Sequence, residues 1–507
     1  MDWLTNRKAL LIVLVVFVLG AFYRAYHFAV TGFFVPDEYG YTYFHLGEIN
    51  YQGRQFFQLF NSVILPHNVD QLVLIMPFYF MFWFSIGIFS AYKTMKLFGY
   101  QERAISATLL LSITIPVYLL FSAAILTEPV AFALAMLGMY SFAKFWKTGG
   151  YRYPFISAIF FVAAAYTRVD FIVFQALGFL PFAVAEFGRS KHWPKTLGAT
   201  SAFAVPATFF AFYPSNGVVA TSAALQSIAA ATHGLPATIN SSAIGTIVQA
   251  PPSGNLLYNA LHFIAVGLVL GFNPVTGFLF AASFFITLFA VLKRKKDSLI
   301  PFLVGILGLG TFAGTVLVYM VVPNIPTSTA LRYAYDASPA FFIFMPILFS
   351  KIKWDLAYTS IATSIIIVSL VGASAYPAFL QSNLTFSYPF LHGENFLSLD
   401  YRTPYAQIRD YFHSLPPQHF DVVAETVSLA GNVTTNWKFT PGVSDIAITF
   451  HPWNATTKLT HFYLYLEPDW QSLPDNDTIR AVFHFHHFAT IPIYSSSSFF
   501  FAEVFNG

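Results

Sequence analysis

Two adjacent carboxylates, Asp37 and Glu38, follow a proline at the end of a long apolar segment. Because proline cannot continue a helix interior, we expect the pair where the first helix leaves the bilayer. The next residues, 38–60, are aromatic and amphipathic but not apolar enough to span, which predicts a helix lying in the membrane interface. His45 and Arg54 belong to this segment. The two acids are therefore either solvated loop side chains or part of a site at the membrane boundary.

Three more charged motifs stand at the predicted outer ends of apolar runs. Glu128 lies in "ILTEPVAF", Arg168 and Asp170 lie in "AAYTRVDFIVF", and Arg332 and Tyr333 lie in "TALRYAYDASPAFF". Charged groups near membrane depth are costly, so they normally pair or serve a function. The structural alternatives are an ion pair of Arg168 with Asp170 that locks the helix turn, and snorkelling of Arg332 to the interface.

Together with Asp37, these groups predict a cavity of acids and arginines that opens outward at the lipid boundary. The planar fork of an arginine guanidinium suits phosphate. A phosphate tethered to a lipid would lie at this depth. The residues therefore predict a substrate that is a lipid with a phosphorylated head.

The composition places these residues in a membrane protein. Of 507 residues, 56% are hydrophobic and 10% are charged, whereas soluble domains carry about 25% charged residues. The absence of cysteine excludes disulfides and thiolate ligands. We expect a retained first helix rather than a cleaved signal peptide. About eleven spans are predicted, at residues 9–30, 71–92, 104–121, 129–146, 154–169, 171–188, 196–213, 258–291, 299–322, 337–350 and 356–378.

The basic residues predict the orientation. With the N-terminus in the cytoplasm, every predicted inner loop carries at least two Lys or Arg, as the positive-inside rule requires. These loops contain Arg7, Lys8, Lys93, Lys96, Arg103, Lys144, Lys147, Arg152, Arg189, Lys191, Lys195, Lys293, Arg294, Lys295, Lys296, Lys351 and Lys353. An odd number of spans then places the C-terminus outside.

The composition changes after residue 380, and polar residues become frequent. We assign residues 1–380 to a transmembrane domain and residues 381–507 to a small external α/β domain. In the latter, "TPYAQIRDYFHSLPP" predicts a helix, and "FDVVAET" and "HFYLYLE" predict strands. The run "VFHFHHFA" favours a strand with half-solvated imidazoles over a metal site. Residues 214–257 are expected to form a long external loop.

The Asp-Glu pair in the first loop resembles the GT-C superfamily of polyprenyl-phosphate-sugar-dependent glycosyltransferases. The resemblance extends to the Thr-Glu-Pro of residues 127–129, and to the Arg-Tyr of residues 332–333 with a proline leading into a late span. An external C-terminal domain fits as well. The branch of protein O-mannosyltransferases and aminoarabinose transferases is the most similar. The architecture matches over residues 1–380, and the C-terminal domain matches no family we can name.

The resemblance implies an inverting transfer of a single sugar from a polyprenyl (dolichyl-type) phosphate to an acceptor hydroxyl on the external face. In that family the first-loop Asp is the general base, here Asp37, and Glu38 would orient the acceptor or a metal. The leaving lipid phosphate needs no general acid. Arg168 and Arg332 would steady its charge. The other candidates for substrate binding are Glu128, Asp170, Tyr333, Arg54 and His45.

The expected partners follow from this interpretation. They are a polyprenyl-phosphate sugar lipid, an acceptor protein, glycan or lipid, and the membrane, with no nucleic acid. No cofactor is required and no obligatory metal is expected, although His233 could help to hold a divalent ion. The Trp-Trp-Asp motif of oligosaccharyltransferases is absent, which argues against transfer of a whole oligosaccharide. We expect the plasma membrane of a prokaryote, and an archaeon is one such source.

Two other functional classes stay open at this point. A transporter or flippase of a lipid-linked or anionic substrate would need ionisable groups near the bilayer midplane and repeated, broken helices. The sequence has no internal repeat that we can detect. A non-catalytic scaffold with an external partner-binding domain would leave the placement of the arginines unexplained.

Overall fold

The computed structural model describes most of the helical region and six strands near the C-terminus. The described helical stretches are residues 69–124, 126–212, 256–293, 298–319 and 332–351. The predicted spans at 9–30 and 356–378 lie outside these stretches, apart from isolated helical positions between residues 15 and 26.

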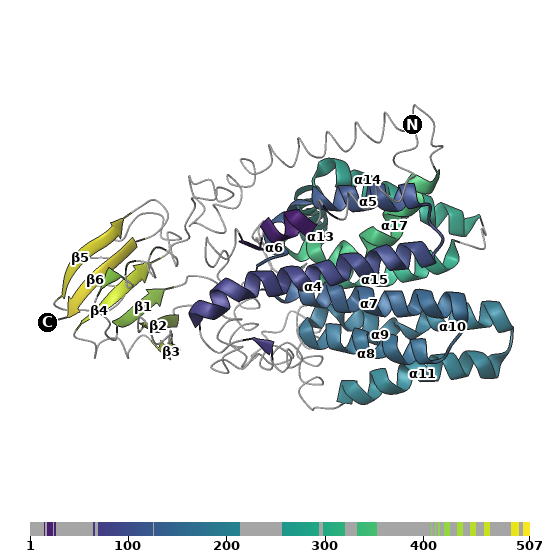
Figure 1. The fold of residues 1–507 in the computed structure, drawn as a ribbon, viewed down its shortest axis with the longest axis horizontal. Coiled ribbons are helices and arrows are strands. Elements are labelled where there is room, and N and C mark those ends of the chain that lie inside the picture. Colours follow the sequence, from purple (N-terminus) through teal and green to yellow (C-terminus); the bar gives the residue numbers. More distant parts are fainter. Residues whose placement is uncertain are drawn as a thin grey trace.

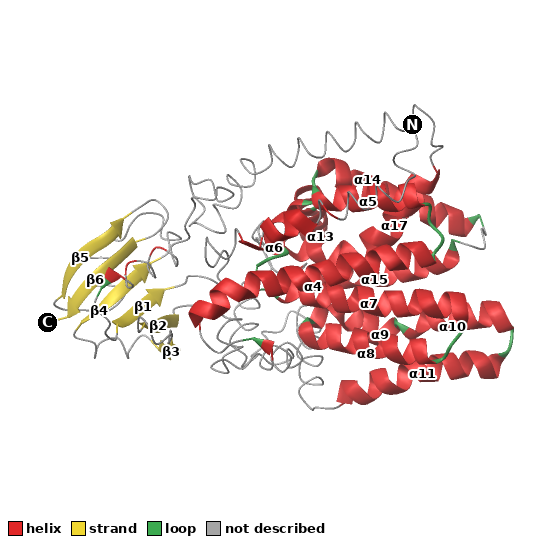
Figure 2. Cartoon of the chain, viewed as in Figure 1, coloured by secondary structure: helices red, strands yellow, loops and turns green. Residues whose placement is uncertain are grey.

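Helices make up the described part of the first 351 residues (Figures 1 and 2). In chain order they are α4 (Val69–Leu97), α5 (Glu102–Ile113), α6 (Pro116–Phe121), α7 (Thr127–Thr148), α8 (Arg152–Thr167), the 3₁₀ turn η2 (Val169–Phe171), α9 (Ile172–Leu177), α10 (Phe179–Ser190), α11 (Trp193–Phe212), α13 (Leu256–Val266), the π-helical turn η3 (Gly267–Gly271), α14 (Pro274–Leu292), α15 (Leu299–Tyr319), the 3₁₀ turn η4 (Ala334–Ala337) and α17 (Ser338–Lys351).

Several of these helices can cross a membrane. Among the described residues, five segments are long and apolar enough, namely Leu74–Leu97, Thr127–Thr148, Ile172–Ser190, Pro274–Leu292 and Leu299–Leu317. Large apolar side chains on them point away from the protein, such as Phe278, which is 74% exposed. Helices that are apolar on their outer face as well as their inner face belong in lipid. The chain is an integral membrane protein.

Two predicted spans are interrupted rather than continuous. The predicted helix at 104–121 is α5 followed by α6, because Ile115 adopts an extended conformation before Pro116, as residues that precede proline commonly do. The predicted helix at 258–291 is α13, η3 and α14, with a break at Asn273 before Pro274. Each break falls where proline starts a new helix, a position at which its missing N–H costs nothing.

Close packing brings the start of α7 beside the end of α8. Gly138 of α7 faces Phe161 of α8, where an added Cβ atom would lie 2.3 Å from the ring. Ser157 Oγ of α8 donates a hydrogen bond to the carbonyl oxygen of Gly138 at 2.9 Å. On its other side α7 packs against α4, where Gly87 accommodates the ring of Phe132. These contacts position the two helix ends that carry the site.

The C-terminal region contains a mixed sheet with strand order β3-β2-β1-β4-β6-β5 (Figure 1). The central pair β1–β4 is parallel, and the other pairs are antiparallel. The two predicted strands are confirmed as β1 and β4. The bounds are β1 (Phe420–Glu425), β2 (Val433–Phe439), β3 (Ala447–Pro452), β4 (His461–Leu466), β5 (Phe488–Ser495) and β6 (Phe500–Asn506). Of the residues described within the predicted helix at 403–417, Gln407, Tyr411 and Ser414 are helical and Leu415 lies in a bend.

Candidate functional site

Two arginines from distant parts of the chain converge on one carboxylate. Glu128 lies in the first turn of α7 and is fully buried. Its Oε1 atom accepts a hydrogen bond from Arg332 Nε and lies 2.5 Å from Arg168 Nη1. Arg168 and Arg332 are 2% and 6% exposed. A single buried oxygen therefore holds two guanidinium groups side by side.

Arg168 is the centre of this network. Its second nitrogen, Nη2, pairs with Asp170 Oδ2 at 2.5 Å and with Asp336 Oδ2 at 3.2 Å. The local sequence explains its position: Arg168 ends α8 in an extended conformation, and the turn η2 brings Asp170 back towards it. Charge-assisted bonds to a planar guanidinium are the strong class of protein hydrogen bond.

Asp336 is anchored from α15. Thr315 Oγ1 donates to Asp336 Oδ2 at 3.1 Å, and Thr311 Oγ1 lies 2.6 Å from the backbone oxygen of Asp336. Both threonines are buried. Neither threonine was predicted from the sequence. Their spacing of four residues in an apolar helix places them on the same helix face, which is the one signal that pointed to them.

Tyr333 lies against both arginines. Its ring centroid is 4.7 Å from Arg168 Cζ and 5.8 Å from Arg332 Cζ. A cation over an aromatic face is attracted by the ring quadrupole. The ring thus limits where the two guanidinium planes can move.

The charges of the buried part are balanced. Two arginines face two fully buried carboxylates, Glu128 and Asp336, while Asp170 is 17% exposed at its side chain. Removing one partner from such a set leaves an uncompensated buried charge. The cluster can therefore hold two guanidinium groups in a defined place beside the start of α7, the end of α8 and the start of α17.

Several predicted site residues are brought together by the fold. They share one network and come from three separate motifs: Glu128, Arg168, Asp170, Arg332 and Tyr333. The ion pair of Arg168 with Asp170, the structural alternative for that motif, is present. Snorkelling of Arg332 is not what the structure shows, because its side chain is buried against Glu128.

The predicted cavity stays a prediction, because Asp37 lies outside the described residues. The described acids and arginines contact one another directly, and less than a tenth of either arginine is exposed. Apolar helices surround the charges, and direct pairing lowers the cost of burying them. The remaining candidates lie outside the described residues: Asp37, Glu38, His45, Arg54 and His233.

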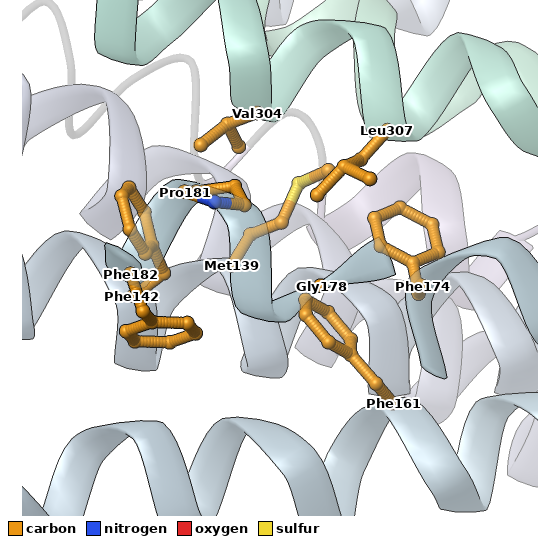
Figure 3. A pocket seen from close by; sticks show the side chains of 9 residues that line it. All are labelled: Met139, Phe142, Phe161, Phe174, Gly178, Pro181, Phe182, Val304 and Leu307. Carbon is orange, nitrogen blue, oxygen red and sulfur yellow. The ribbon is translucent and has the colours of Figure 1, made fainter. Parts of the chain in front are cut away.

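No group of three His, Cys, Asp or Glu with metal-binding geometry occurs among the residues that the structure describes. The histidines of the run 484–487 lie outside that part. A small apolar pocket lies between α7, α8, α9, α10 and α15 (Figure 3). Phe174, Phe182, Met139 and Leu307 are among its lining residues, and the space is little larger than a water molecule. Such a void stays dry, so it provides no site for a charged or sugar ligand.

Comparison with known proteins adds a likeness of fold. No family model and no curated protein matches the sequence. The crystal structure of ArnT from Cupriavidus metallidurans, bound to undecaprenyl phosphate, is similar with a TM-score of 0.52 over 97% of this chain and 97% of that chain, at 11% identity.

Two structures from Archaeoglobus fulgidus also match. The oligosaccharyltransferase AglB in complex with an inhibitory peptide and a dolichol-phosphate has a TM-score of 0.46 at 11% identity, over 98% of this chain and 74% of that one. An oligosaccharyltransferase tethered to an acceptor peptide has a TM-score of 0.43 at 12% identity, over 82% of this chain and 61% of that one. The chain has the GT-C fold.

Proposed function

We propose that this GT-C-fold chain is a membrane glycosyltransferase that moves one sugar from a polyprenyl phosphate to an acceptor hydroxyl on the external face. The observation that carries the proposal is the convergence of Arg168 and Arg332 on Glu128. Two guanidinium groups held together at helix ends are suited to a phosphate monoester or diester. The likeness to ArnT bound to undecaprenyl phosphate supports a lipid phosphate as that ligand.

In this proposal the arginines act on the leaving group. As the bond from the sugar to the phosphate oxygen breaks, negative charge grows on the lipid phosphate. Arg332 and Arg168 stabilise that charge without having to reorganise, because Glu128 and Tyr333 already hold them in place. Glu128 and Asp170 position the arginines or bind sugar hydroxyls.

The resemblance supplies the other half of the mechanism. Asp37 takes the proton of the acceptor hydroxyl, which attacks the anomeric carbon from the face opposite the phosphate and inverts its configuration. Glu38 orients the acceptor or a metal, and His45 and Arg54 are further candidates for substrate binding. No metal is needed for these steps, and a divalent ion near Glu38 is the alternative that a chelator tests.

We also propose the finer architecture. It has about eleven spans, a cytoplasmic N-terminus and interfacial helices in the first external loop, with an external α/β domain at residues 381–507. The location is the plasma membrane of a prokaryote. The sheet β1–β6 and the helical positions near residue 411 support such a C-terminal domain.

The place of the charges argues against the alternative of a transporter or flippase. Glu128 starts α7, Arg168 ends α8 and Asp336 precedes α17. A transporter would place its ionisable groups on broken helices near the bilayer midplane. In the described helices the network lies at helix ends instead.

The test combines lipid binding with sugar transfer. Purified protein in nanodiscs would be titrated with undecaprenyl phosphate, and then given labelled polyprenyl-phosphate hexoses with envelope acceptors. Arg332→Lys keeps the positive charge but loses the planar guanidinium group that can donate two parallel hydrogen bonds to phosphate. We therefore expect the affinity for undecaprenyl phosphate to fall roughly tenfold or more. The control is Arg152→Lys at the exposed start of α8, whose side chain contacts Tyr153. Equal binding by Arg332→Lys and the wild type would contradict the proposed phosphate site.

Asp37→Asn separates chemistry from binding. Loss of a general base lowers the rate by about 10²- to 10⁴-fold, while the lipid phosphate should bind as before. Transfer at the wild-type rate would show that the acid pair is structural. A chelator added to the wild type decides whether a metal takes part.

A further inference from the structure

The break between η3 and α14 is an unusual piece of backbone. A π-helical turn, Gly267–Gly271, runs into Phe272 and Asn273, and α14 starts at Pro274. Asn273 has φ 61° and ψ 156°, a conformation that residues other than glycine rarely adopt. π-Helical turns and strained residues both occur often at functional sites.

The surrounding contacts hold this break in place. Asn273 Oδ1 accepts a hydrogen bond from Thr276 N at 2.9 Å, and the backbone oxygen of Asn273 accepts from Gly277 N at 2.8 Å. Gly277 lets η3 approach α14 closely, since an added Cβ atom would lie 2.4 Å from the carbonyl oxygen of Leu268. The Asn273 amide therefore lies over the first turn of α14.

Two polar atoms in this turn have no hydrogen-bond partner within the described structure. They are Asn273 Nδ2 and Thr276 Oγ1, on residues that are 1% and 0% exposed. An unsatisfied buried donor or hydroxyl costs about 1–3 kcal/mol each. Two such unsatisfied groups in one helical turn, next to the strained residue Asn273, both lower the stability of the fold. A bound ligand that pairs with them would account for their presence.

The residue before Asn273 packs among aromatic rings. The Phe272 ring lies 6.4 Å from the Tyr118 ring and 5.5 Å from the Phe341 ring, measured between centroids. The turn η3 also contacts η4, which carries Asp336 of the charged network. A neutral polar turn therefore lies beside the turn that carries Asp336, a partner of Arg168.

We propose that Asn273 and Thr276 form the subsite for hydroxyl groups of the sugar on the lipid donor, an inference that rests on the proposed function. An amide N–H can donate to a sugar hydroxyl oxygen, and the threonine hydroxyl can donate or accept. Neither group is charged, so the turn is matched to a neutral sugar, while the phosphate is matched to the guanidinium groups nearby. The sugar would satisfy both buried atoms at once.

Binding at this subsite requires movement. Both side chains are buried, so the outer end of the bundle has to open around η3 and η4 before a sugar can enter. The free energy of binding then includes the two hydrogen bonds that the closed arrangement lacks. Specificity of this kind is strong, because a ligand without the matching hydroxyl leaves the buried groups unpaired.

The experiment measures discrimination between two lipids. Undecaprenyl phosphate and a panel of undecaprenyl-phosphate hexoses and pentoses would be titrated into the full chain in nanodiscs. Asn273→Ser keeps a neutral oxygen that can cap Thr276 N but removes the amide donor, and Thr276→Val removes the hydroxyl at similar volume. Thr287→Val is the control, because Thr287 Oγ1 lies buried further along α14 and donates to Ser283 O.

The expected result is a selective loss. Wild type should bind at least one sugar-bearing lipid more tightly than undecaprenyl phosphate. Each subsite variant should reduce that preference roughly three- to tenfold, with unchanged affinity for undecaprenyl phosphate. Variants that weaken both lipids equally, or neither, would overturn the subsite, as would a wild type without any preference in the panel. A wild type that binds no polyprenyl phosphate at all would instead overturn the proposed function, and the subsite with it.

Discussion

At the scale of single residues, Glu128 is the group on which the network depends. It is fully buried and shared by two arginines that stand 40 and 204 positions further along the chain. Asp170, by contrast, keeps contact with solvent, since 17% of its side chain is exposed. Solvent partly screens the Asp170 carboxylate, whereas loss of the buried Glu128 carboxylate removes one shared counter-charge from two buried guanidinium groups at once.

This difference gives the first prediction. Glu128→Gln should lower the free energy of unfolding by about 3–5 kcal/mol, because two buried guanidinium groups lose their common counter-charge. Asp170→Asn should have a smaller effect. The measurement is the thermal unfolding midpoint of purified protein in one detergent.

Glu102→Gln is the matched control for this prediction. Glu102 pairs with Lys96 at 3.2 Å, but the two side chains are 39% and 53% exposed. Exposed pairs of this kind are screened by water, so the midpoint should stay at the wild-type value. Equal shifts in Glu128→Gln and Glu102→Gln would contradict the view that the buried network stabilises the start of α7 and the end of α8.

At the scale of elements, several helices meet through glycines, and α6 and α14 begin at prolines. Gly308 lets α15 approach the start of α17, since an added Cβ atom would lie 2.6 Å from the backbone nitrogen of Ala340. This approach sets the distance from the threonines of α15 to Asp336. The close spacing of α15 and α17 therefore keeps the two threonines within hydrogen-bonding distance of Asp336.

The second prediction compares two glycines of α15. Gly308→Ala should destabilise the protein and weaken binding of undecaprenyl phosphate, because backbone atoms cannot move aside as a side chain can. An added Cβ atom at Gly314 meets no described atom within 4 Å, and alanine favours a helix over glycine by up to about 1 kcal/mol. Thermal unfolding and lipid binding of both variants test this. A neutral Gly308→Ala would show that α15 and α17 can separate freely.

At the scale of the whole molecule, the basic ends of several helices are tied together. Arg189 of α10 donates through Nη2 to the carbonyl oxygens of Phe145 and Trp146, at 2.8 and 3.1 Å, and so caps the end of α7. Tyr151 Oη donates to Lys195 O at 3.4 Å. The two turns that follow α7 and α10 thus form one basic surface, the expected cytoplasmic side under the positive-inside rule.

The third prediction concerns orientation. The chain contains no cysteine, so Lys191→Cys and Asn454→Cys each introduce the only thiol. A membrane-impermeant maleimide applied to intact cells should label Asn454→Cys, and should label Lys191→Cys only after permeabilisation. The reverse pattern would place the C-terminal region in the cytoplasm and would exclude transfer on the external face by the proposed site.

Much of this molecule is readable from the order of its residues. The membrane class, most helix positions, strands β1 and β4, and the grouping of Glu128, Arg168 and Arg332 were all predictable. Apolar runs report burial in lipid directly, and a charge at a helix end in such a run needs a partner. Asp37 and Glu38 stay predictions because they lie outside the described residues. The chemical roles of the other site residues stay predictions because contacts alone do not assign a reaction step.

Other features depend on how distant segments pack. The direct pairing of both arginines with Glu128 joins residues 204 positions apart, and no local pattern encodes such a distance. The hydroxyl of Thr315 reaches Asp336 only because Gly308 brings α15 close to α17. The break at Asn273 was not predicted, because residues 258–291 form one long apolar run. Hydropathy indicates burial in lipid but does not detect a single turn in the backbone. Tertiary packing decides these contacts because each one is stable only when the others are made.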